Sequence, residues 1–259
     1  LKRLGVGDEE QIAGLLHDVS QFSFSHIVDW VFADGSNGNE SYHDSLHDLY
    51  ISSTSLPAIL ARYGYDTPRI SDEGFFPILE NDLPDLCADR IDYSLRELHY
   101  NGHPEVGPTA LGGLALKSGK IVFVDMSSAK VFAEGYMSLQ RDSWGNTKGV
   151  ASYAILSSAF KRAVGLGAVE HDDFWLKSED ELIEVIKGCN DDYITDCLER
   201  LKRGDYSEKR GEKVYKKFRY VDPFVEVSAG GLKRLSDIDN EYALMLEEAR
   251  RTAHEGVVI

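Results

Sequence analysis

Apolar residues recur at intervals of three and four positions along most of the chain, a spacing that predicts amphipathic helices. In the first such segment, residues 8–18, acidic residues open the helix and Ile12, Leu15 and Leu16 follow on one stripe. The same spacing predicts further helices in residues 25–32, 42–51, 55–64, 83–100, 127–139, 147–167, 178–189, 191–204 and 237–256. The fold class expected from this pattern is mainly α.

Strand-like patterns are confined to two stretches of the sequence. Residues 119–125 and residues 213–227 are rich in β-branched and aromatic side chains. A segment rich in glycine and proline, residues 101–113, indicates a break between two parts of the chain. We therefore expect a helical core over residues 1–105 and a small α+β accessory region, helical with short β elements, over residues 106–259.

The composition narrows the class of protein and its partners. Of the 259 residues, 42% are hydrophobic and 28% are charged, which is normal for a soluble globular chain with a sizeable core. No apolar run approaches the ~18 residues of a membrane span, so no membrane partner is expected. The formal net charge of -16 argues against binding to nucleic acid, which needs a basic surface. This charge does not exclude binding of a phosphate-bearing small molecule, because a metal or local arginines can outweigh the negative electrostatic potential of the whole chain.

The cysteines bear on the cellular compartment. Cys87, Cys189 and Cys197 show no CxxC spacing, and an odd, sparse set argues for reduced thiols rather than a disulfide framework. We therefore expect a cytoplasmic protein.

The first candidate for chemistry is the pair His17–Asp18, which follows the apolar run 13–16 and so lies at the edge of the core. Both side chains would be costly to bury unpaired, whereas a metal can take ligands from adjacent residues near a helix end. Other His-Asp pairs, at residues 43–44, 47–48 and 171–172, are expected to be solvated.

The second candidate lies in residues 87–97. Asp89 and Asp92 are three positions apart on one helical face, with Arg90 and Tyr93 beside them. A surface helix with many charges is one interpretation. The other makes Asp89 a metal ligand and places Arg90 and Tyr93 for contact with phosphate oxygens.

Together, three separated motifs resemble those of the HD-domain metal phosphohydrolases. They are "AGLLHDVSQFSFSH" (residues 13–26), "YHD" (42–44) and "LCADRIDYSLRE" (86–97). The resemblance is strongest to the branch that contains the deoxynucleoside triphosphate triphosphohydrolases. Residues 119–144 and 218–225 are also similar to the accessory region of that branch.

This resemblance implies an all-α core that holds a divalent metal ion through three ligands named by the motifs: His17, Asp18 and Asp89. It assigns four residues to the phosphate side of the site: His26, His43, Arg90 and Tyr93. The implied activity is hydrolysis of a nucleotide or similar phosphoester, in which the cation neutralises phosphate oxygens and histidines serve the leaving group. A site of histidine and aspartate accepts Mn, Fe, Co, Ni, Zn or Mg.

The chain departs from the family pattern in two respects. Gln21 stands where the family has a histidine. Four positions after His17, it is expected on the same helical face, where glutamine can hydrogen-bond a phosphate but cannot carry a proton. The family's first metal-ligand histidine lies on an earlier helix and is absent from the sequence as given. The alternative expectation is a catalytically impaired HD-fold protein that binds a nucleotide or a protein partner.

Two features carry weaker expectations. His43 and His47 have the spacing of a metal-ligand pair on one helical face, and His47 could replace the missing ligand, although we expect it to be exposed. Residues 209–219 form a basic cluster that is expected to be a solvated hairpin, or else to contact a nucleotide or a neighbouring subunit. A homo-oligomer is compatible with the sequence.

Overall fold

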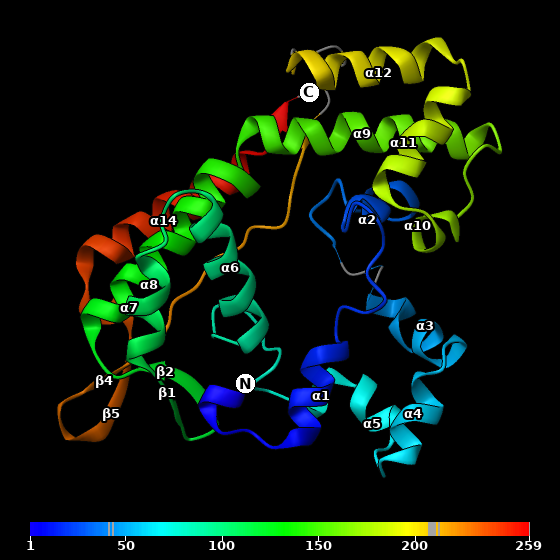
Figure 1. Cartoon of the computed structure of the whole chain (residues 1–259). Coiled ribbons are helices and arrows are strands. Elements are labelled where there is room, and N and C mark those ends of the chain that lie inside the picture. Colours follow the sequence, from blue (N-terminus) through cyan, green and yellow to red (C-terminus); the bar gives the residue numbers. More distant parts are fainter. Residues whose placement is uncertain (41, 43, 207–210, 212, 259) are drawn as a thin grey trace. The chain divides into compact units, whose positions relative to one another are not determined.

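The computed structural model describes residues 1–40, 42, 44–206, 211 and 213–258, and it is mainly α-helical, as the hydrophobic pattern predicts. The chain divides into two compact units, each assembled from separated segments (Figure 1). Unit 1 comprises Leu1–His17, Ile51–Trp144 and Arg219–Thr252, and unit 2 comprises Asp18–Tyr50, Gly145–Phe218 and Ala253–Ile259. The predicted division into a core and an accessory region at residue 105 stays a prediction.

Unit 1 holds most of the helices and one small sheet. Its α-helices are α1 (Asp8–Leu16), α4 (Leu56–Arg62), α5 (Thr67–Ser71), α6 (Ala88–Tyr100), α7 (Val106–Gly113), α8 (Met126–Leu139), α13 (Leu235–Ile238) and α14 (Asn240–Glu255). Its short helices are the 3-10 turns η1 (Lys2–Leu4), η3 (Glu73–Phe75) and η5 (Ser228–Gly230) and the π-helical segment η4 (Gln140–Trp144). Helix α3 (His47–Ser53) begins in unit 2 and ends in unit 1, and α14 begins in unit 1 and has its last residues, 253–255, in unit 2.

Helix α1 is held in unit 1 by its apolar side chains. Ala13 and Leu16 are buried in a cluster with Leu60 of α4 and Leu79. Burial of a leucine-sized side chain contributes about 1.5–3 kcal/mol, so this stripe fixes the end of α1. The prediction that Leu15 shares the stripe is wrong, because its side chain is 80% exposed and lies outside this cluster.

The sheet of unit 1 has four strands in the order β1-β2-β4-β5. Their bounds are β1 (Leu114–Lys117), β2 (Lys120–Phe123), β4 (Phe224–Val227) and β5 (Gly231–Arg234). Strands β1 and β2, and also β4 and β5, pair antiparallel, whereas β2 pairs parallel to β4. The strand predicted within residues 119–125 is therefore confirmed as β2.

The break predicted over residues 101–113 is only partly correct, because α7 occupies its second half. Pro108 lies in the first turn of α7, where a proline ring is tolerated since the amide N–H there has no partner within the helix. Val106 and Ala110 are buried. Gly113 lets α7 approach α8 closely, because a Cβ at this position would lie 2.4 Å from Cβ of Ser128.

Unit 2 is organised around one long helix. Its helices are α2 (Ile27–Phe32), η2 (Asp44–Leu46), α9 (Thr147–Gly165), α10 (Asp173–Leu176), α11 (Glu179–Gly188) and α12 (Asp192–Arg203), and its two strands are β3 (Lys213–Val214) and β6 (Val257–Val258). Figure 1 shows α12 running alongside α9. Phe160 of α9, Phe174 of α10 and Ile186 of α11 are fully or nearly fully buried in one cluster.

The strand predicted over residues 213–227 is interrupted in the structure, where only β3 and β4 are extended pairs. Between β3 and β4, single backbone amides donate hydrogen bonds to carbonyls of other segments. The amide of Tyr215 donates to the carbonyl of Ser36, and the amide of Asp222 donates to the carbonyl of Pro84. This segment therefore connects the strands without forming a ladder. Among the described residues, no helix has the length and apolar character needed to cross a membrane.

Candidate metal centre

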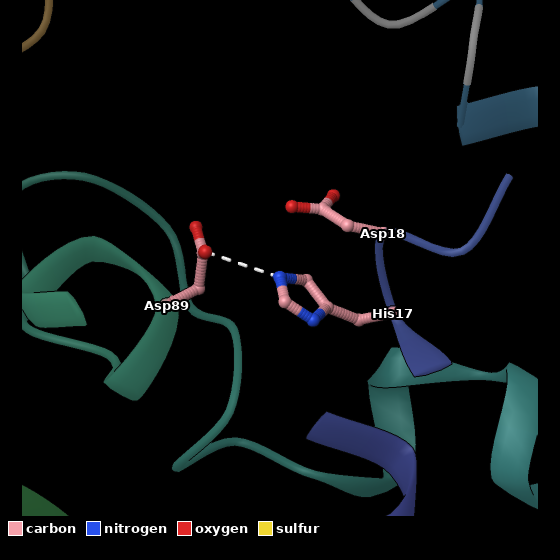
Figure 2. Close-up of side chains that lie close together, drawn as sticks. All are labelled: His17, Asp18 and Asp89. Atoms are coloured by element: carbon pink, nitrogen blue, oxygen red, sulfur yellow. Dashed lines mark hydrogen bonds and ion pairs between the residues drawn. The ribbon is translucent and has the colours of Figure 1, made fainter. Parts of the chain in front are cut away.

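The first side chain of the centre, His17, directly follows the last residue of α1. Its backbone is still helical (φ -57, ψ -38), and its Nδ1 lies 2.9 Å from the carbonyl oxygen of Gly14. Because a carbonyl oxygen only accepts, Nδ1 carries the proton of this hydrogen bond. The other ring nitrogen, Nε2, lies 3.1 Å from Oδ1 of Asp89 (Figure 2). Nε2 thus faces a carboxylate oxygen, an arrangement that either a bound cation or a proton on Nε2 stabilises.

Asp89 is the second residue of α6, and two groups of contacts fix its position. The amide of Ala88 donates to the carbonyl of Ile78 (2.7 Å), and the amide of Asp89 donates to the carbonyl of Leu79 (3.2 Å). Cys87 caps the helix, because its Sγ accepts from the amide of Arg90 at 3.4 Å. A carboxylate in the first turn is also favoured by the helix dipole.

Asp18 completes the centre, and as the residue after His17 it is placed there by the chain itself. Ligand atoms of His17, Asp18 and Asp89 all lie within 4.8 Å of one another. Asp18 is exposed, whereas the other two are half-buried. Figure 2 shows both carboxylates directed toward the region that Nε2 of His17 faces. The structure therefore brings together the three residues that the sequence predicts as metal ligands.

Arg90 is buried, and its guanidinium is directed into the loop that precedes α6. Nη1 donates to the carbonyl of Asp85 (2.7 Å) and to Sγ of Cys87 (3.2 Å). Nη2 donates to Oε1 of Glu80 (3.2 Å) and to the carbonyl of Asn81 (3.0 Å). These contacts occupy both terminal nitrogens, so the predicted contact between Arg90 and phosphate has no support in this geometry.

Tyr93 lies one helical turn after Asp89 on α6. Its hydroxyl lies 2.7 Å from the hydroxyl of Tyr136, and its ring meets Trp144 edge to face, with centroids 5.7 Å apart. Burial raises the pKa of the Tyr93 phenol above its ordinary value of 10.0, so the hydroxyl keeps its proton at neutral pH. Tyr93 is thus an oriented hydrogen-bond donor or acceptor on the same helix as Asp89.

His26 lies in unit 2, as the N-cap of α2. Its Nδ1 lies 3.2 Å from Oδ2 of Asp29, and its Nε2 lies 4.0 Å from Oε2 of Glu40. Both carboxylate side chains are fully buried. They fix the ring of His26 in one orientation. His43, the other histidine predicted for the phosphate side, lies outside the described residues.

Two sequence-based placements are wrong. Gln21 was expected on the helical face of His17, but α1 ends at Leu16 and Gln21 is exposed beyond a turn in which its amide donates to the carbonyl of Asp18. His47 was expected to be exposed on a helix shared with His43. It is instead 9% exposed, begins α3 after a 3-10 turn, and has its Nδ1 2.8 Å from Oγ of Ser20.

The residues that support the predicted ones carry little signal in the sequence. Asp29 interrupts the apolar run of α2, and a carboxylate within such a run signals a buried ion or hydrogen-bond partner. Glu97 and Trp144 gave no such signal, because Glu97 fits an ordinary amphipathic helix and Trp144 lies between two predicted helices. Only the structure shows that their side chains meet.

Several known proteins are similar to this chain, although no family model matches it. The uncharacterized protein YdhJ of Bacillus subtilis is 32% identical over 272 residues, which covers 100% of this chain and 80% of YdhJ. The metal-dependent phosphohydrolase cns2 of Cordyceps militaris is 27% identical over 245 residues, which covers 87% of this chain and 67% of cns2. A crystal structure of a phosphohydrolase from Bacteroides thetaiotaomicron superposes with a TM-score of 0.60 at 15% identity, over 92% of this chain and 78% of that chain, and so shares its fold.

Proposed function

We propose that the chain is an HD-type phosphohydrolase, which hydrolyses a phosphoester of a nucleotide or similar small molecule with a divalent metal ion. The observation that carries the proposal is the convergence of His17, Asp18 and Asp89, whose ligand atoms lie within 4.8 Å of one another. The relative cns2 is named a metal-dependent phosphohydrolase, a name that includes both the metal and the reaction type.

The donor set fits such an ion. One imidazole nitrogen and two carboxylates suit Mn, Fe, Co, Ni or Zn, whereas Mg prefers oxygen ligands alone. The hydrogen bond from Nδ1 of His17 to Gly14 leaves Nε2 as the ligand atom and fixes its direction, which is the usual role of a backbone carbonyl behind a metal-binding histidine. The short approach of Nε2 to Asp89 also places two electron-rich atoms where a cation would separate them.

The roles of the other residues follow from their chemistry. When bound, the cation neutralises negative charge on the phosphate oxygens. Tyr93 has a protonated hydroxyl that can donate to a phosphate oxygen. His26 and His43 are assigned to the phosphate side, where an imidazole can protonate the leaving oxygen. Gln21 is assigned as a neutral hydrogen-bonding group there.

Metal analysis combined with a hydrolysis screen tests this proposal. The purified chain is loaded with Mn²⁺, dialysed and assayed for bound metal, and then mixed with nucleoside mono-, di- and triphosphates and simple phosphoesters. We expect the protein to bind metal and to release phosphate or a polyphosphate from at least one nucleotide. Treatment with a chelator should remove both the bound metal and the hydrolysis. Asp92→Asn is the matched control for Asp89→Asn, because Asp92 lies on the same helix, is exposed and is paired with Arg96.

Each other outcome has a defined meaning. Hydrolysis that survives complete removal of metal would contradict the metal-dependent mechanism. Binding of metal and nucleotide without any turnover would support the alternative, a catalytically impaired HD-fold protein that binds a nucleotide.

A further inference from the structure

Three aromatic side chains form a cluster on the side of α6 that bears Asp89. The hydroxyls of Tyr93 and Tyr136 are 2.7 Å apart, and Tyr136 is fully buried. The indole of Trp144 meets both rings edge to face, with centroid distances of 5.7 Å to Tyr93 and 5.1 Å to Tyr136. The orientation of Tyr93 therefore depends on where the indole is held.

The indole is held by Glu97. Nε1 of Trp144 donates to Oε2 of Glu97 at 2.7 Å, and Oγ of Ser143 donates to Oε1 at 3.1 Å. The two oxygens of the Glu97 carboxylate thus accept one hydrogen bond each, from two consecutive residues. Hydrogen bonds to a charged acceptor are stronger than those between neutral groups, so Glu97 is a firm anchor for this turn.

The turn that Glu97 holds is π-helical. Residues Gln140–Trp144 continue α8 with this wider spacing. π-helical turns are rare and occur frequently at functional sites. At its other end the turn is also anchored, since Oε1 of Gln140 accepts from the amide of Arg219 at 3.1 Å.

Spacing on α6 links this anchor to the metal centre. Asp89, Tyr93 and Glu97 are four residues apart, so they lie in one row on the same face of the helix. Tyr93 therefore follows Asp89, and Glu97 follows Tyr93, by about one turn of the helix. The row therefore consists of the proposed metal ligand Asp89, the phenol of Tyr93 and the carboxylate of Glu97, which holds the indole beside that phenol.

We propose that Glu97 is a positioning residue of this site, which fixes the ring and hydroxyl of Tyr93 next to Asp89 by holding the indole of Trp144. The inference rests on the proposed function and goes beyond it, since it concerns a residue that contacts neither metal nor phosphate. Glu97 acts through the N–H group of the indole. Removing either partner should therefore have the same effect as removing both.

A double-mutant cycle tests this inference. Glu97→Gln removes one acceptor and the charge, Trp144→Phe removes the indole N–H, and both changes are combined in a third variant. Asp92→Asn is the control, because it removes a charge from the exposed face of the same helix. The measurements are kcat and KM for the best nucleotide of the screen, Mn²⁺ affinity by calorimetry, and near-ultraviolet circular dichroism.

We expect Glu97→Gln to lower kcat/KM about tenfold, less than the ~100-fold loss that a 1 Å misplacement can cause. Mn²⁺ affinity should stay within about twofold, because a residue that acts on Tyr93 leaves the ligands in place. Adding Glu97→Gln to Trp144→Phe should cause less than about a twofold further loss. The circular dichroism band of the indole should change in Glu97→Gln and not in the control.

Other results would overturn the inference. The first is a kcat/KM for Glu97→Gln equal to that of the control. The second is a loss of kcat/KM in the double variant that equals the product of the two single losses. The third is a fall in Mn²⁺ affinity as large as the fall in kcat/KM. If the unaltered protein hydrolyses no phosphoester, the proposed function has failed, and the indole spectrum then decides the positioning role alone. An unchanged spectrum in Glu97→Gln would contradict it.

Discussion

Nε2 of His17 lies 3.1 Å from Oδ1 of Asp89, although the two residues are 72 positions apart in the sequence. One belongs to the end of α1 and the other to the start of α6. The first is fixed by buried side chains such as Leu16, and the second by the loop that Arg90 holds. The centre therefore depends on two sets of contacts that meet at Leu79, whose side chain packs with Leu16 and whose carbonyl accepts from the amide of Asp89.

Asp89→Asn should abolish tight metal binding while the fold is kept. An amide oxygen is a poorer ligand than a carboxylate, and loss of a supporting group alone typically costs 10–100-fold in metal affinity, so we expect at least ~100-fold for a direct ligand. Calorimetric titration with Mn²⁺ measures the change, with Asp92→Asn as the control. Equal affinity in Asp89→Asn and in the unaltered protein would remove Asp89 from the ligand set.

Arg90→Lys should weaken both the fold and the metal centre. Lysine keeps the charge but cannot reach the four acceptors of the loop, so half-buried carbonyls lose their partners, at a cost of roughly 1–2 kcal/mol. Urea unfolding measures the stability, and Mn²⁺ titration measures the metal affinity. If stability and metal affinity are unchanged and only the KM for a phosphoester rises, the sequence-based role of Arg90 as a phosphate ligand is correct and the anchoring role is not.

Asp85→Asn should lower stability at neutral pH and have progressively less effect in acid. Burial alone would raise the pKa of Asp85, but hydrogen bonds and charges from Lys120 and Arg234 lower it below 3.8. A carboxyl with a lowered folded-state pKa contributes stability above its unfolded-state pKa, and this is lost as the pH falls through the folded-state value. We expect a loss of roughly 2 kcal/mol at pH 7, declining below about pH 4.

Urea unfolding from pH 7 down to pH 3 measures this dependence. Asp82→Asn, an exposed position in the same loop, is the matched control. If Asp85→Asn lowers the free energy of unfolding by the same amount at all pH values, the carboxylate charge is not the source of the stability.

Gln21→His should leave metal affinity within about twofold. The helical placement that would direct a histidine toward the metal does not exist, because α1 ends before His17 and Gln21 is exposed. Any effect should fall on turnover, where general acid–base help is typically worth 10²–10⁴-fold. A tenfold gain in Mn²⁺ affinity would mean that position 21 reaches the metal after all.

The parts of this fold that the sequence predicts are those set by local patterns. The stripe that contains Leu16 and the separated ligand motifs need only short-range information, and the structure contains both. The helix over 106–113 was missed because its close packing on Ser128 overrides the low helix propensity of Gly113.

The remaining site residues depend on long-range contacts. Gln21 was misplaced because periodicity cannot locate the residue at which α1 stops. Arg90 looks like an exposed cation in sequence, and only the folded loop around Asn81 shows that its donors are used. Glu97 is indistinguishable from a solvated helix residue until Trp144 is brought to it.

The segmental construction of unit 1 has a consequence for synthesis on the ribosome. A nascent chain that has emerged as far as Trp144 contains both His17 and Asp89 but lacks β4 and β5. Asp85 then has Lys120 available but not Arg234, and Pro84 lacks the amide of Asp222. Since chains grow at about 5–20 residues per second, the loop before α6 waits several seconds for its last anchors. Premature termination between residues 144 and 234 would therefore yield a protein that has His17, Asp18 and Asp89 but an incomplete support for Asp89.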